Sequence, residues 1–362
     1  MKKRGVLLIS FLLFVSLSLV ACIQGEQTLE EIDVPEESTI IEEDDELALE
    51  TEEDFNNEED LTEGEVSEES EETVLREIYL FDAEGFVVPQ QMELPKTESA
   101  ALTTMQYMVK DGPVTELLPN GFEAVLPANT EILGMNLSDD GTLVIDLSEE
   151  FTNYEAKDEI KILEAITHTM TQFDNIERIK LWINGEELSE MPVNGTPISS
   201  GYSVEKGINV FLEGKPNIQK SKAITVYYPK QYHDQFYHVP ITRYFDATDE
   251  ALYEQIIESV MGNPSFNLNV AQVFNDGAKL MEKPLLDKGV LQLVFNNAIL
   301  KDETEGVIAD EVMETIIKSV SALEEVEAVD VKVENKSTIV SESGVTYNRP
   351  VTLNDIKAEE KM

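Results

Sequence analysis

The sequence is poor in the residues on which most catalytic and metal sites depend. Its 362 residues include one Cys, three His and one Trp. A single thiol excludes a disulfide within the chain and rules out a multi-cysteine metal site. The chain contains no Gly-x-Ser-x-Gly sequence and no phosphate-cradling glycine loop, so it lacks the signatures of a nucleophile elbow and of a nucleotide-binding loop.

Positive charge is also scarce. The chain has 26 Lys and Arg residues against 73 Asp and Glu residues, which gives a net charge of −47. Such a chain is repelled by phosphate backbones, so nucleic acid is excluded as a partner. Anionic lipid head groups repel it too, so attachment to a membrane requires an anchor.

The first residues supply such an anchor. Three positive charges are followed by an apolar run over residues 5–20, which is short for a membrane-spanning helix. The run ends in Leu19-Val20-Ala21-Cys22, which resembles the bacterial lipobox. The resemblance implies that residues 1–21 are a lipoprotein signal peptide and that Cys22 carries a diacylglycerol, with palmitate as the expected acyl group. Several acyl chains on one residue bind a membrane stably, whereas a single chain does so only marginally.

An acidic linker follows at residues 22–73. Between Ile23 and Thr73 there are 24 Asp or Glu residues and no Lys or Arg. Low hydrophobicity with charge of one sign predicts a disordered segment, because too little apolar surface is available to offset the entropy of folding. We interpret it as a solvated tether; an arm that binds calcium or a partner is the alternative.

The remainder reads as a tandem duplication of an α/β unit with the order β-β-α-β-β-α-β. Three landmarks recur at a nearly constant interval, which is the signature of a repeat. The pairs are Pro113 and Pro264, Gly141 and Gly289, and Ile183 and Val333. The two glycines are expected in turns that need positive φ, and the two prolines are expected to end helices.

The predicted organisation is two similar domains at residues 74–195 and 222–345, joined by a connector at 196–221 and followed by a tail at 346–362. The fold class is α/β (α+β), with two amphipathic helices on one face of a small mixed sheet in each domain. Apolar spacing predicts helices at 99–110 and 160–173 in the first domain, and at 252–260 and 307–323 in the second.

Several stretches resemble the GerM family of sporulation and germination lipoproteins, which carry two GerMN domains. They are Arg76-Glu77-Ile78-Tyr79-Leu80, Leu117-Leu118-Pro119-Asn120-Gly121-Phe122, Val125-Leu126-Pro127, Glu190 to Ile198, Thr225-Val226-Tyr227-Tyr228 and Gly289 to Phe295. GerMN domains are similar to ring-building modules of secretion systems. The resemblance implies an extracytoplasmic protein, lipid-anchored on the mother-cell membrane and facing the forespore. It also implies a structural part in the channel complex, beside the forespore protein called stage II sporulation protein Q.

No catalytic, metal or cofactor site is predicted, and ligand-binding residues are not identified. His168 falls in a helix, where a packed or surface histidine is the expected role. His233 and His238 flank Asp234 in a hairpin, with too few neighbouring ligands for a metal. The loop Pro119-Asn120-Gly121-Phe122 is interpreted as a folded-back plug, with an exposed contact as the alternative.

The leading functional hypothesis is therefore a non-enzymatic scaffold that binds envelope proteins. A peptidoglycan-binding module that recruits or regulates wall hydrolases is the alternative, and a solute-binding lipoprotein is a weaker one. Peptidoglycan and further copies of the chain are additional candidate partners.

Overall fold

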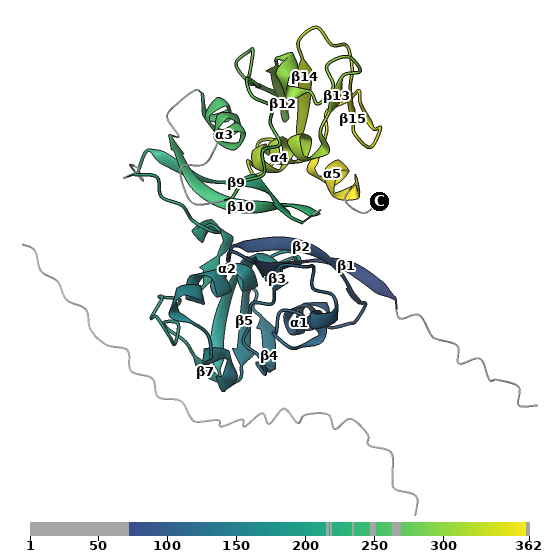
Figure 1. The fold of residues 1–362 in the computed structure, drawn as a ribbon. Coiled ribbons are helices and arrows are strands. Elements are labelled where there is room, and N and C mark those ends of the chain that lie inside the picture. The colour runs from purple at the N-terminus through teal and green to yellow at the C-terminus, as the bar shows by residue number, and fades with distance from the viewer. Residues whose placement is uncertain are drawn as a thin grey trace, which may run out of the picture. The chain divides into compact units, whose positions relative to one another are not determined.

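The computed structural model describes residues 72–214, 217, 219–233, 235–246, 251–262 and 269–359 (Figure 1). The predicted signal peptide, Cys22 and nearly all of the acidic linker lie outside the described residues, as do Asp234 and Pro264. In the described part, no helix combines the length and the apolar character needed to cross a membrane.

The first domain contains two sheets. The antiparallel hairpin of β1 and β2 carries β3 on its other edge, and a second sheet runs in the order β4-β5-β6-β7, with β8 paired to β6. β5 and β6 are parallel. The bounds are β1 (Thr73–Asp82), β2 (Val87–Pro95), β3 (Phe122–Glu123), β4 (Ile132–Leu137), β5 (Thr142–Leu147), β6 (Arg178–Ile183), β7 (Glu186–Glu187) and β8 (Tyr202–Ser203).

Two α-helices complete this domain, α1 (Ala100–Gln106) and α2 (Glu159–Met170). α2 packs on the hairpin and on β6, so its buried residues fill the space between the two sheets. The prediction of a helix over 99–110 was too long. Met108 and Val109 stay buried, but the backbone N–H groups of Val125 and Leu126 donate to the Met108 carbonyl, so the chain leaves the helix after Gln106.

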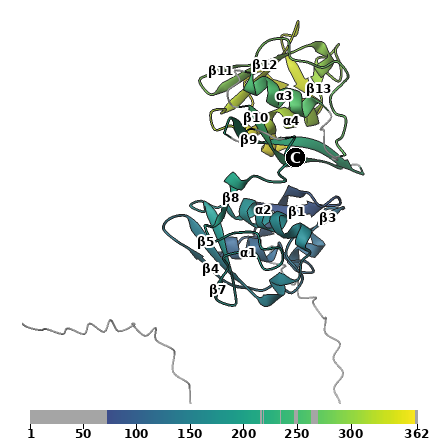
Figure 2. The ribbon, with the colours of Figure 1, turned by 90° about the vertical axis from the view of Figure 1, so that its left-hand side faces the viewer.

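The second domain repeats this plan with its own hairpin of β9 and β10, a β11-β12-β14 sheet and a separate β13-β15-β16 sheet. α3 and α4 pack on the hairpin and on each other (Figure 2). The bounds are β9 (Ser221–Tyr232), β10 (Gln235–Asp246), α3 (Leu252–Met261), β11 (Leu285–Asp287), β12 (Val290–Phe295), β13 (Val307–Ile308), α4 (Asp310–Val320), β14 (Ala328–Val333), β15 (Ile339–Ser341), β16 (Thr346–Tyr347) and α5 (Leu353–Glu359). Short 3-10 helices are η1 (Pro113–Glu116), η2 (Glu149–Thr152), η3 (Ala156–Asp158), η4 (Val204–Lys206) and η5 (Asn297–Ile299).

The helix predicted at 307–323 was wrong at both ends. Val307 and Ile308 form β13, which pairs in parallel with β15, and α4 begins only at Asp310. β-branched residues suit such a buried strand. Leu323 lies beyond the helix but is buried, which explains why its apolar spacing looked helical.

The glycines predicted to mark equivalent turns do so. Gly141 and Gly289 have φ of 77° and 80°. Each accepts the backbone N–H of a glutamate, Glu177 or Glu327, at 2.8 Å. The parallel pairs β5–β6 and β12–β14 start directly after these turns, so the two halves share one construction.

Parts of the predicted connector and tail are built into the domains. Ile198, Tyr202 and Ile208 are buried, and β8 pairs with β6. In the tail, β16 pairs with β15, and Ile356 of α5 is buried. Apolar burial therefore extends past Gly195 in the first half and past residue 345 in the second.

Candidate functional site

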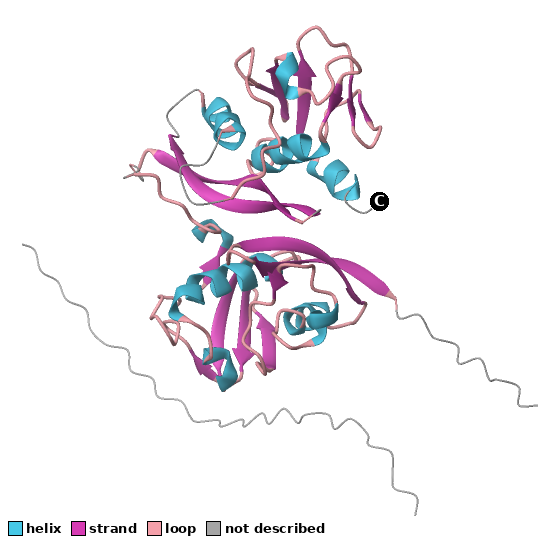
Figure 3. Ribbon diagram, viewed as in Figure 1, coloured by secondary structure: helices cyan, strands magenta, loops and turns pink. Residues whose placement is uncertain are grey.

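The two hairpins meet in a buried polar junction. In Figure 3 the magenta strands β1 and β2 lie beside β9 and β10, and the two domains contact each other through β2 and β10. Asp82 at the end of β1 pairs with Lys230 of β9 at 2.7 Å, and the two side chains are 0% and 4% exposed. The pair joins equivalent positions of the repeat, because 82 and 230 differ by the same 148 positions as Gly141 and Gly289.

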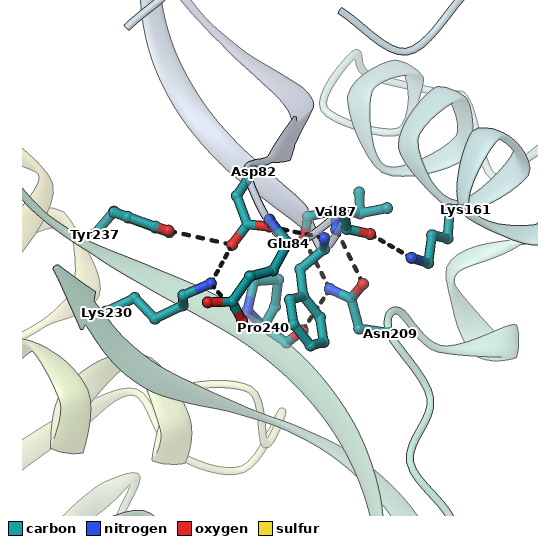
Figure 4. Close-up of polar contacts among 10 residues, drawn as sticks. Asp82, Glu84, Val87, Lys161, Asn209, Lys230, Tyr237 and Pro240 are labelled. Atoms are coloured by element: carbon teal, nitrogen blue, oxygen red, sulfur yellow. Dashed lines mark hydrogen bonds and ion pairs between the residues drawn. The ribbon is translucent and has the colours of Figure 1, made fainter. Parts of the chain in front are cut away.

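The Asp82 carboxylate is saturated with hydrogen bonds (Figure 4). Its Oδ1 accepts the backbone N–H groups of Glu84 and Phe86, each at 2.9 Å. Its Oδ2 accepts the Tyr237 hydroxyl at 3.2 Å. Burial, followed by the nearby Asp82 charge, raises the pKa of Tyr237 well above its ordinary value, so this phenol stays protonated as a donor.

Lys230 is enclosed as fully as its partner. Glu84 lies 3.1 Å from its ammonium group, and the rings of Phe86 and Tyr237 lie 5.3 Å and 5.8 Å from it. Charge pairing and cation–π contacts both offset the loss of hydration. A buried pair of this kind fixes geometry, because removing one partner leaves an uncompensated charge.

Asn209 fastens the connector to both hairpins (Figure 4). Its Nδ2 donates to the carbonyls of Val87 at 2.7 Å and Pro240 at 2.8 Å, and its Oδ1 accepts the Val87 N–H at 3.0 Å. Its φ of 45° is in the left-handed region that asparagine tolerates. One side chain thus bonds to β2 and β10 at once, which restrains the two domains relative to each other.

Helix α2 supports this contact with a buried carboxyl group. Glu164 Oε2 accepts the Asn209 N–H at 3.0 Å, and burial raises the pKa of Glu164 to about 7. Lys161 of the same helix donates to the Gly85 carbonyl in the turn between β1 and β2. The connector, the first hairpin and α2 are therefore held together at a single point.

The loop at residues 119–122 is a plug, as predicted. Phe122 is buried, and its ring packs edge-on against Tyr237 with centroids 5.0 Å apart. Gly121 has φ of 84°, and a methyl group there would lie 2.8 Å from the Tyr232 ring. The plug therefore belongs to the junction, which the sequence did not indicate.

His168 and His238 pack within their domains, whereas His233 is exposed. Burial lowers the pKa of His168 to about 4, and its ring lies 5.2 Å from that of Tyr79. Burial and then Lys318 hold the pKa of His238 well below its ordinary value, and its Nε2 lies 3.0 Å from the Thr315 hydroxyl. His233 sits at the β9–β10 turn with φ of 53°. Among the described residues, no three His, Cys, Asp or Glu side chains are grouped as metal ligands.

Two cavities flank the junction. The first, of about 430 Å³, lies beside α4, and we call it the α4 cavity. The second, of about 660 Å³, lies beside α2, and we call it the α2 groove. The α4 cavity is lined by polar groups among aromatic ones, including Glu77, Tyr79, Gln90, Tyr227, His238 and Glu314. The α2 groove is more apolar and includes Phe86, Ile160, Tyr202, Val210 and Ile241.

Sequence reasoning missed the residues that build this junction. The sequence patterns singled out none of Asp82, Lys230 and Asn209. The available signal was the repeat interval, which makes Asp82 and Lys230 equivalent and opposite in charge. That signal cannot show that equivalent positions face each other, because facing is a tertiary property.

Comparison with known proteins supports the division of the chain into two similar domains. The protein family described as "Germane: Sporulation and spore germination" matches twice, at residues 77–189 and 225–338. The chain belongs to this Germane family. The two matched segments start 148 positions apart, which confirms the tandem repeat.

A relative and a solved structure, both of GerM from Bacillus subtilis, are closely similar to this chain. The chain is 38% identical over 331 residues to "Spore germination protein GerM" of Bacillus subtilis (strain 168). The aligned region covers 91% of this chain and 90% of that protein. A solved structure, "Tandem GerMN domains of the sporulation protein GerM from Bacillus subtilis", is 40% identical with a TM-score of 0.67, and the match covers 78% of this chain and 97% of that one. The predicted family, its tandem GerMN domains and the mixed α/β fold are thus confirmed. The family description names sporulation and spore germination and no reaction.

Proposed function

We propose that this Germane-family protein is a non-enzymatic, membrane-anchored scaffold in the complex that links the mother-cell and forespore membranes. The observation that carries the proposal is the junction of Asp82, Lys230 and Asn209. A scaffold must present two binding modules at a fixed spacing, and a buried, fully paired polar junction holds them so. The charged groups of this junction are engaged in structural bonds rather than exposed to a substrate.

The anchor is the second part of the proposal. The lipid on Cys22 would hold the chain on the mother-cell membrane, and the acidic segment would set the distance to the folded domains. The proposed partners are envelope proteins of the type of stage II sporulation protein Q, together with further copies of the chain. β4 offers a surface for such contacts, because it is an edge strand on which Leu133 and Leu137 are more than two-fifths exposed.

The test compares three forms of the full chain in a sporulating host that lacks its own copy. These are the wild type, Cys22→Ala and Lys230→Ala. We expect Cys22→Ala to lose membrane retention, and both variants to disperse a fluorescently tagged forespore partner and to lower spore yield. Lys110→Ala is the matched control, because Lys110 forms an exposed ion pair with Glu123. Normal partner localisation and normal spores in the complete deletion would refute the scaffold role.

Peptidoglycan binding with recruitment of wall hydrolases is the alternative function. The polar and aromatic lining of the α4 cavity is the observation that favours it, because amide, carboxylate and aromatic groups together suit a glycan. A pulldown of the full chain on purified sacculi separates the two functions. The scaffold predicts little retention, and the wall-binding module predicts retention that soluble muropeptides compete away.

A further inference from the structure

The repeat allows each residue of the first domain to be matched to one in the second. Tyr79 pairs with Pro89 across the first hairpin, and Tyr227 pairs with Pro240 across the second. The Tyr79 N–H donates to Thr169 of α2 at 3.0 Å, as the Tyr227 N–H donates to Ser319 of α4 at 2.9 Å. The matching interval is therefore 148 positions for β1 and β9, 151 for β2 and β10, and 150 for α2 and α4.

These intervals relate the two cavities. Asn209 bonds to Glu164, Val87 and Pro240. Their counterparts in the other half are Glu314, His238 and Pro89, and all three line the α4 cavity. The α4 cavity is thus the counterpart of the place that Asn209 fills beside α2.

Among the residues that the structure describes, none fills that place in the second domain. Tyr202 pairs with Ile179, and Val351 pairs with Val329, so the segment after Val351 is the counterpart of the connector after Tyr202. The connector continues past its short helix to Asn209. The counterpart segment instead forms α5, whose Leu353 lies at the edge of the cavity.

One buried hydroxyl group that lines the α4 cavity, that of Ser321, lacks a hydrogen bond within the described chain. Its counterpart is satisfied, because Thr171 donates to the Thr167 carbonyl. Buried polar groups are nearly always bonded in the functional state, so the Ser321 hydroxyl points to an occupant.

The charges in the cavity restrict that occupant. Glu77, Glu311 and Glu314 contribute three carboxylates to the lining, against the single ammonium group of Lys318. An acidic ligand is therefore disfavoured, and a neutral or basic ligand rich in N–H donors is favoured. An extended peptide carrying a carboxamide side chain, such as the connector itself, has this chemistry.

We propose that the α4 cavity binds an extended segment of a partner polypeptide, with an asparagine placed as Asn209 is placed beside α2. Its backbone N–H would donate to Glu314, and its carboxamide would donate to the Pro89 carbonyl beside or in place of the Gln90 amide, which donates there at 2.7 Å. In the second domain the partner segment thus takes the place that the connector of the same chain takes in the first domain. This inference deepens the scaffold role by naming a docking site, and its binding test does not depend on membrane location.

The first test uses the purified full chain in mild detergent and a fluorescein-labelled peptide of residues 204–213, read by fluorescence anisotropy. We expect saturable binding that weakens about tenfold when the peptide carries Asn209→Ala. Tyr227→Phe and Glu314→Gln in the protein should each weaken binding about fivefold or more. Tyr253→Phe, which removes a hydroxyl outside the cavity, should leave binding unchanged.

Several outcomes would overturn the proposal. They are an absence of binding at millimolar protein, equal binding of the wild-type and Asn209→Ala peptides, and loss of binding with Glu164→Gln but not with Glu314→Gln. The last result would place the peptide in the α2 groove. Displacement of the peptide by chito-oligosaccharides would make the cavity a glycan site instead. The results without glycan leave the scaffold role standing, and displacement by glycan would favour the wall-binding alternative. Failure of the deletion experiment, in contrast, leaves the peptide site standing.

A second test identifies the natural occupant. A benzoylphenylalanine in place of Phe236, which lines the cavity and is 39% exposed, is photolysed in sporulating cells. Support is a crosslink that maps to one segment of another protein, contains asparagine and is competed by the 204–213 peptide. Crosslinks only to further copies of the chain, or only to glycan, would refute a partner polypeptide.

Discussion

In each domain a carboxylate at the start of the long helix binds the loop that follows the last parallel strand. The two carboxylates differ in the number of hydrogen bonds that they accept from this loop. In the first domain Glu159 is fully buried and accepts the backbone N–H groups of Val193, Asn194 and Thr196 at 3.1, 2.6 and 2.9 Å. Tyr154 adds its hydroxyl at 2.9 Å. Burial pushes the pKa of Glu159 up, but the hydrogen bonds from the loop outweigh it, and the pKa lies below its ordinary value.

In the second domain the carboxyl group nearest this place is Asp310, one position beyond Ala309, which matches Glu159. It accepts the Glu342 N–H at 3.1 Å and interacts with Ser343, and here burial prevails and raises the pKa. The pKa values of two carboxyl groups at the start of the corresponding helices are thus shifted in opposite directions. The number of donors aimed at the charge decides the sign, because each donor stabilises the ionised form while burial opposes it.

The largest effect expected in the comparison comes from the pair that joins the two domains. Asp82→Ala should destabilise the protein by about 4 kcal/mol, because Lys230 would stay buried beside only the half-exposed Glu84. Urea unfolding of the full chain measures this. Lys110→Ala, at an exposed pair, should cost at most about 1 kcal/mol. Equal costs for the two variants would show that the junction is not rigid.

The loop carboxylates give the next effect. Glu159→Ala should cost roughly 3 kcal/mol, because three backbone donors lose their acceptor, whereas Asp310→Ala should cost about 1 kcal/mol. A group with a lowered pKa contributes its stability above its ordinary value, here 4.5. The Glu159→Ala deficit should therefore shrink as the pH falls below about 4.5. Thermal unfolding of both variants from pH 3 to pH 8 tests this, and a deficit independent of pH would exclude the charge as its source.

Glu164 should behave in the opposite sense. Its pKa rises from 4.5 to about 7 on folding, so its stabilising contribution is complete below the lower value and is lost as the pH rises through the higher one. Glu164→Gln should thus be neutral near pH 4 and stabilising above pH 7, by at most about 3 kcal/mol. Melting temperatures over this range are the measurement, with the exposed Glu205→Gln as control. Stabilisation that is larger at low pH would contradict the assignment.

The smallest effect should be the same in both domains. Gly141→Ala and Gly289→Ala each place a side chain at positive φ, with the new methyl group 2.8 Å from the side chain of Glu177 or Glu327. We expect about 1–2 kcal/mol for each, because the flexible glutamates can move aside. The measurement is the free energy of unfolding of each variant. A difference of more than about 1 kcal/mol between the two variants would show that the two turns are not equivalent.

The sequence predicted the repeated turns better than the helix ends. Turn residues located the equivalent turns at Gly141 and Gly289, because such signals are local. The helix ends at Gln106 and at Asp310 depend on which backbone groups find partners in distant segments, and apolar spacing does not record that. The junction was missed for the same reason.

By itself the sequence determined the repeat, the α/β class and the family, because periodicity, turn residues and matched stretches are properties of the chain. It also marked Cys22 as the expected anchor, a prediction that lies outside the described residues. Only the tertiary structure brought Asp82 to Lys230, placed Phe122 against Tyr237 and left a cavity where Asn209 has no counterpart among the described residues. Residues separated by more than a hundred positions meet there, and their energies depend on burial and partners that exist only after folding.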